Sequence, residues 1–73
     1  MKKDENYHLS AILYNERIAC CAEELAEEVL NPIVQKWCRA VVKQHRFHEK
    51  RHRAALDKLR KRTAEAEKEQ QHG

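Results

Sequence analysis

Glycine and proline are nearly absent from this sequence: one proline stands at position 32 and one glycine at position 73, the last residue. Because tight turns between short strands rely on these two residues, their scarcity excludes a fold built from many strands. The apolar residues recur instead at helical spacing. We therefore predict an all-α protein whose one break in helix falls at Asn31-Pro32.

Long apolar segments are also lacking. No apolar run approaches the roughly 20 residues that a transmembrane helix needs, and the charged start of the chain leads into no apolar segment typical of a signal peptide. We therefore expect a cytoplasmic protein that makes no membrane contact. In a reducing cytosol the three cysteines, Cys20, Cys21 and Cys38, are expected to be free thiols that fill space.

Asn31 and Pro32 divide the chain into two segments. Asparagine is a good N-cap, and proline suits the first position of a helix, where no N–H donor is needed. We predict a frayed lead over 1–5, a single domain over 6–63 with a first helix at about 6–30 and a second at about 33–66, and an exposed, partly disordered tail over 64–73. Two arrangements stay open: a helical hairpin, which we favour, and a kinked, nearly continuous helix.

The first helix is predicted to be amphipathic with an acidic back. The stripe expected to face the second helix consists of Tyr7, Ala11, Tyr14, Ile18, Ala22, Leu25 and Val29, and Ile12, Ala19, Ala26 and Leu30 widen this face to one side. The glutamates expected on the polar back are Glu16, Glu23, Glu24, Glu27 and Glu28.

A hairpin of this size buries too little apolar surface to be stable alone, and small chains usually add disulfides, a metal or partner subunits. We predict a homodimer, either a four-helix bundle or a coiled-coil-like pair, with parallel and antiparallel arrangements both open. Heptad spacing on the second helix predicts the residues of its core or dimer seam, which are Val34, Trp37, Cys38, Val41, His45, His48, His52, Leu56 and Leu59.

Three histidines, His45, His48 and His52, interrupt this seam. They are interpreted either as neutral side chains that fix the register through hydrogen bonds or as a layer that binds a transition metal or responds to pH. In both cases protonation below about pH 6 is expected to weaken the assembly, because it places like charges in a poorly solvated seam.

Residues 48–52 also match the H-E-x-x-H motif of zinc peptidases. The candidate metal ligands are His45, His48, Glu49 and His52. A third ligand in a suitable framework is missing, and two cations within the motif oppose metal binding. We therefore expect neither a catalytic site nor a bound cofactor, and keep a transition metal as an alternative.

Glu49 and His52 also have the Glu-x-x-His spacing of ferritin-like di-iron bundles. Such a site needs glutamates that point inward from the other helix. Because Glu16 and Glu23 are expected on the polar back of the first helix, the pattern disfavours a di-iron centre.

Charge is distributed unevenly along the chain. Residues 1–32 carry three basic and seven acidic side chains, a net charge of −4, whereas residues 33–73 carry twelve and five, a net charge of +7. The second helix therefore offers a candidate polyanion-binding surface, formed by Lys43, Arg46, Lys50, Arg51, Arg53, Arg60 and Arg62. The alternative, which we favour, is a solvated face partly paired with the acidic first helix.

A short, highly charged helical chain that tolerates free cysteines resembles the accessory proteins encoded in the early regions of lambda-like bacteriophages. The resemblance concerns the general character of the whole chain and no particular motif. It implies a non-enzymatic regulatory protein that engages a host protein through a helical surface. The alternatives are a nucleic-acid-associated regulator that uses the basic face of the second helix, and a metal-binding helical dimer.

Overall fold

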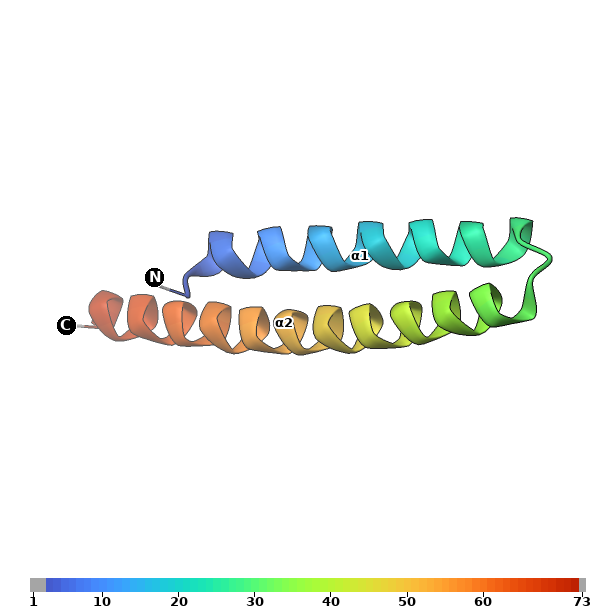
Figure 1. The fold of residues 1–73 in the computed structure, drawn as a ribbon. Helices are drawn as coiled ribbons and strands as arrows, with labels where there is room; N and C mark the ends of the chain where they lie inside the picture. The colour runs from blue at the N-terminus through green and yellow to red at the C-terminus, as the bar shows by residue number, and fades with distance from the viewer. Residues whose placement is uncertain (1–2, 73) are drawn as a thin grey trace.

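A computed structural model describes residues 3–72, with side chains through Lys68. The chain folds into two helices, α1 at Glu5–Glu28 and α2 at Pro32–His72, which pack against each other as an antiparallel hairpin (Figure 1). The all-α class and the hairpin are confirmed, and the kinked, nearly continuous helix is excluded. The hairpin is a rod of 64 × 18 × 15 Å.

Local hydrogen bonds at the helix ends explain where each helix begins. Asp4 caps α1, because its Oδ1 accepts a hydrogen bond from the backbone N–H of Tyr7 at 2.9 Å. Asn31 caps α2, because its Oδ1 accepts from the N–H of Ile33 at 2.9 Å. Pro32 follows at the first helical position, where its missing N–H leaves no donor unpaired.

The turn is held by one further side chain. The Nε2 of Gln35 donates a 2.6 Å hydrogen bond back across the turn to the carbonyl oxygen of Val29. Because α1 ends at Glu28, Leu30 and Asn31 both leave the helix, and the chain can reverse its direction.

The interface between the helices contains little apolar core. Among the described residues, the buried apolar side chains are Ile12 and Ala19 from α1 and Cys38 and Leu56 from α2. Polar side chains occupy the remaining buried positions, which are His8, Asn15 and Glu49. The interior of the hairpin is therefore partly polar.

The inward stripe of α1 differs from the one predicted. The buried positions are His8, Ile12, Asn15 and Ala19, of which Ile12 and Ala19 were predicted at the widened edge of the apolar face. Tyr14 and Leu25, which were expected to face α2, are 63% and 42% exposed. The physical reason is that the apolar arc of α1 is wider than one partner helix can cover. One edge of that arc packs against α2, and the other edge remains on the surface.

The ends of the chain also differ from expectation. α1 begins at Glu5, and Met1 and Lys2 of the expected frayed lead lie outside the described residues. α2 continues to His72, beyond the predicted end at about residue 66, and the side chains over 61–68 are exposed. Of the predicted tail, only Gly73 lies outside the described residues. Neither helix has, within 3–72, a stretch long and apolar enough to cross a membrane.

Candidate interaction surfaces

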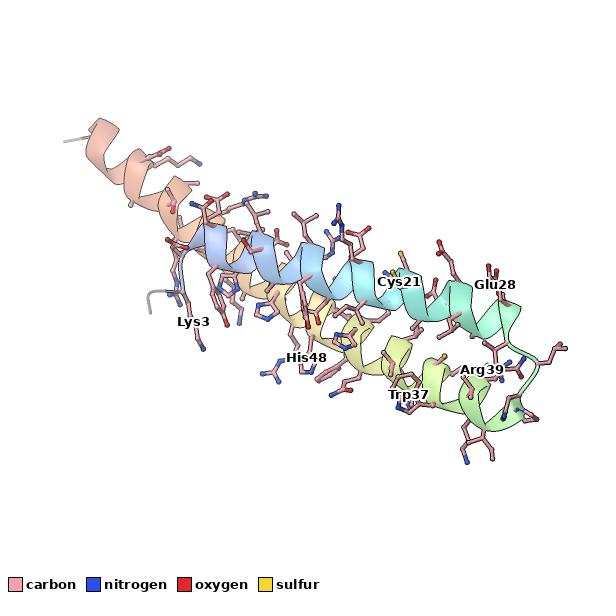
Figure 2. The ribbon with its side chains drawn as sticks, turned by 45° about the horizontal axis from the view of Figure 1, so that its top comes forward. Lys3, Cys21, Glu28, Trp37, Arg39 and His48 are labelled. Atoms are coloured by element: carbon pink, nitrogen blue, oxygen red, sulfur yellow. The ribbon has the colours of Figure 1, made fainter. Side chains whose placement is uncertain are left out.

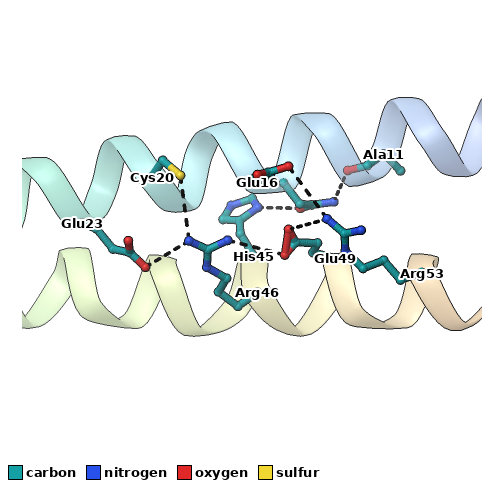
Figure 3. A network of polar contacts seen from close by, with 9 residues as sticks. Ala11, Glu16, Cys20, Glu23, His45, Arg46, Glu49 and Arg53 are labelled. Atoms are coloured by element: carbon teal, nitrogen blue, oxygen red, sulfur yellow. Dashed lines mark hydrogen bonds and ion pairs between the residues drawn. The ribbon is translucent and has the colours of Figure 1, made fainter.

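One edge of the hairpin carries an ion-pair network in which acidic and basic side chains alternate (Figure 3). Glu49 lies at its centre, with Arg46 and Arg53 each 3.5 Å from one of its carboxylate oxygens. Arg46 also pairs with Glu23 of α1 at 3.2 Å. Arg53 reaches Glu16 of α1 at 3.9 Å. The network therefore joins the two helices through two arginines.

Glu49 is the buried member of the network, with a side chain only 11% exposed. A carboxylate can stay ionised at such a position only if it is paired, and its two arginine partners supply that pairing. The hydrogen bond to Glu23 is the main cause that raises the pKa of Arg46, and burial partly opposes it. Arg46 therefore stays charged throughout the physiological pH range.

The positions of Glu16 and Glu23 correct the sequence interpretation. Both were expected on the polar back of α1, but their side chains, 45% and 49% exposed, reach the arginines of α2. The rotation of α1 that exposes Tyr14 and Leu25 explains this, because it moves the glutamates of this flank toward α2. Arginines already occupy the space between these carboxylates and Glu49.

Two histidines of the predicted seam make hydrogen bonds inside the hairpin. His45 Nδ1 lies 2.7 Å from Oδ1 of Asn15, whose Nδ2 donates to the carbonyl oxygen of Ala11 at 2.7 Å. Because the amide nitrogen of Asn15 is committed as a donor, its oxygen must accept from His45. His45 therefore carries its proton on Nδ1.

His52 meets a second histidine, His8, with their Nδ1 atoms 3.1 Å apart. Tyr7 packs edge-on against both rings. One ring must donate and the other accept, so the contact tolerates one added proton but not two. Burial is the main cause that lowers the pKa of His52, followed by the charges of His8, His48, Lys3 and Arg51.

The candidate metal ligands are not brought together within one chain. His45 is bonded to Asn15, Glu49 lies between two arginines, His52 faces His8, and His48 is exposed. Among the side chains that the structure describes, no three His, Cys, Asp or Glu residues are grouped so that they could hold a metal ion.

The predicted seam divides into two sets of residues. Those that lie against α1, buried or half-buried, are Val34, Cys38, Val41, His45, His52, Leu56 and Leu59. Trp37 and His48 lie outside the contact between the helices, and Trp37 is 64% exposed. Figure 2 shows both projecting from the same side of α2.

Trp37 belongs to an apolar face on the flank opposite the ion-pair network. The face forms a shallow groove between the helices, lined by Ile18, Ala22, Leu25, Trp37 and Val41. Cys38 forms its floor, and the charged Arg17 lies at its margin. Tyr14 extends the same flank toward His45, with ring centroids 6.2 Å apart.

The residues proposed for polyanion binding also divide into two sets. Arg46, Arg53 and Arg60 pair with glutamates of α1, the last through a 2.9 Å contact with Glu5. The others, Lys43, Lys50, Arg51 and Arg62, are exposed on α2. Arg51 also lies over the ring of Phe47, 5.7 Å from its centroid.

Sequence reasoning missed the inward positions of His8 and Asn15. The available signal was the heptad spacing of His8, Ile12, Asn15 and Ala19, which matches the spacing on α2. Polar side chains at two of the four positions hid that stripe, because the search for a core weighted apolar residues.

Comparisons with protein-family models, with curated proteins and with solved structures find no match to this chain. The functional inference therefore depends on the surfaces of the hairpin.

Proposed function

We propose that the protein is a non-enzymatic interaction protein that works as a homodimer, in which two hairpins associate through the apolar face into a four-helix bundle. The observation that carries this proposal is the groove lined by Ile18, Leu25, Trp37 and Val41, which lies open on a chain with very few buried apolar side chains.

The accessible surface leaves room for such an interface. The chain exposes 6466 Å². A compact monomer of 8.7 kDa would expose about 4,700 Å². A stable dimer needs about 800 Å² from each partner, an area that a hairpin of this shape can supply along one side.

A second copy of the chain is the occupant that best fits this groove. The face contains no charged residue except Arg17 at its margin, so it offers nothing to a charged partner. A two-fold axis would place Trp37 of one protomer against the groove of its partner. The core of the resulting four-helix bundle would then cover both edges of the apolar arc of α1. Large aromatic side chains at the centre of an interface commonly supply much of its binding free energy.

Two substitutions of similarly exposed apolar residues test the dimer. Trp37→Glu places an unpaired charge in the proposed interface and is expected to raise the dimer dissociation constant by roughly hundredfold or more. Leu13→Glu is the matched control, because Leu13 is 60% exposed away from the groove and its substitution should leave the dimer intact. Light scattering over a range of concentrations gives the molar mass of each variant.

A wild-type mass of 8.7 kDa with a cooperative melt would overturn the proposal. The same measurements in EDTA test the metal-binding alternative, which requires a loss of mass or melting temperature on chelation. Action on a host protein, implied by the resemblance to accessory proteins of lambda-like bacteriophages, stays a prediction.

A further inference from the structure

We propose that the side of α2 facing away from α1 binds the phosphate backbone of double-stranded nucleic acid. We call this surface the outer basic face and define it by Lys36, Lys43, Lys50, Lys58 and Lys61. This inference rests on the proposed function and deepens it by naming a class of partner. It requires that assembly uses the apolar face and leaves the outer basic face free.

The first support is that some cations of α2 form ion pairs with α1 and others do not. Three glutamates of α1, Glu5, Glu16 and Glu23, pair with the arginines of α2 at positions 60, 53 and 46. All five residues of the outer basic face are exposed, and none of them forms an ion pair with any side chain that the structure describes. Internal pairing therefore leaves a surplus of positive charge on one side of the rod.

The second support is the geometry of this surplus. The five positions lie roughly 120–200° around the helix from the buried residue Cys38, next to which Glu49 and Leu56 fall on the same side. Lys36, Lys43 and Lys50 recur at seven-residue intervals and form one straight row. From Lys36 to Lys61 the face extends about 37 Å, close to one turn of a DNA duplex.

A linear polyanion fits this surface better than a membrane or a compact acidic protein. Asp57 is the one acidic residue between positions 33 and 62 besides the buried Glu49. Of the exposed large apolar side chains of α2, Phe47 lies among these lysines, whereas Ile33 and Trp37 lie toward the apolar face that the proposed dimer covers. A membrane-surface helix would need an uncovered apolar stripe beside its cations. Contacts of these lysines with backbone phosphates carry no sequence information, so the predicted binding is independent of sequence.

The test is fluorescence anisotropy with a labelled duplex of about 20 base pairs, titrated between about 50 and 300 mM salt. The ridge variant carries Lys36→Gln, Lys43→Gln and Lys50→Gln. The matched control carries Lys3→Gln, Arg17→Gln and Lys68→Gln, which removes the same charge from exposed positions outside the face. Because Arg17 lines the apolar face, the molar mass of this control is measured to verify that its assembly is unchanged. Gln preserves helix propensity, so both triple variants should fold.

We expect the ridge variant to lose at least tenfold in affinity and to reduce the slope of log K against log salt by about three. The control should keep most of the affinity. Equal losses in the two variants, no binding at the lowest salt, or equally tight binding to poly-glutamate or to anionic phospholipid vesicles would each overturn the proposal. Light scattering on the same samples separates the two proposals: a dimer that does not bind overturns this one, and a monomer that binds overturns only the dimer.

Discussion

Polar side chains at inward positions are what most distinguish this hairpin. His8, Asn15 and Glu49 take places that leucine or isoleucine would fill in an ordinary bundle. Each has a partner: His52 for His8, His45 for Asn15, and two arginines for Glu49. Such pairs add little net stability but penalise any shift that separates the partners. We infer that they fix the register of α1 against α2.

A pH-dependent stability follows from His52. Because its pKa is lowered in the folded state by burial and neighbouring charges, the unfolded chain binds a proton there more readily. The free energy of unfolding should therefore fall as the pH decreases below the ordinary histidine value of about 6.5, while above that value both states are neutral and the contribution vanishes. Urea melts at about pH 7.5 and about pH 5.5 measure the difference.

Two variants assign this pH dependence. His52→Leu should reduce the difference in free energy of unfolding between the two pH values, because it removes the imidazole whose pKa is lowered by folding. His48→Leu, at an exposed position on the same helix, should retain most of it. Wild-type melts that superimpose at the two pH values would contradict the expectation.

At the level of the helices, ion pairs, and not apolar contacts, connect one flank of α1 to α2. The separation of charge along the sequence predicted that the halves could neutralise each other, and the pairs of Arg46, Arg53 and Arg60 with α1 agree with that interpretation. Which cations pair could not be predicted, because the choice depends on the rotation of α1 about its axis. Among the described residues, Ala19 and Cys38 have no exposed surface, and they mark the side of each helix that this rotation turns inward.

Substitution of Glu49 tests the importance of the network. Glu49→Gln preserves the shape of the side chain but leaves Arg46 and Arg53 without their buried counter-charge, and it should lower the free energy of unfolding by about 1–2 kcal/mol. Glu24→Gln is the control, because Glu24 is exposed on the outer side of α1. Chemical denaturation in low salt and in about 1 M salt should show the difference shrinking as the partly exposed arginines are screened. Equal stability of the two variants would show that the network contributes nothing.

The whole molecule is a rod with a radius of gyration of 17.6 Å, where a compact chain of this length would have about 11 Å. Elongation explains why its surface is large, and why one rod can present three different sides: an ion-pair network, an apolar face and an outer basic face. The proposed dimer and the proposed nucleic-acid contact use different sides, so they are compatible in one assembly.

Removal of the C-terminal part of α2 tests whether the segment beyond the end of α1 contributes to the stability of the fold. Residues 61–68 are exposed and extend past the Arg60–Glu5 contact at the start of α1. Deletion of residues 64–73 should therefore change the free energy of unfolding by less than about 0.5 kcal/mol. A urea melt and a light-scattering mass of the shortened chain measure this. A large loss of stability or of dimer mass would mean that this segment packs against the partner protomer.

The sequence by itself determined the secondary structure and the position of the turn, because these depend on local chemistry: helical periodicity, the near absence of glycine and proline, and the cap at Asn31-Pro32. Only the tertiary structure decided which side of α1 faces inward. Its apolar arc is too wide for one neighbour, so the choice depends on long-range contacts: the full burial of Ala19 and Cys38, the histidine and asparagine pairs, and the ion pairs of Arg46 and Arg53 with α1. Those contacts left Trp37 on the surface and buried Glu49.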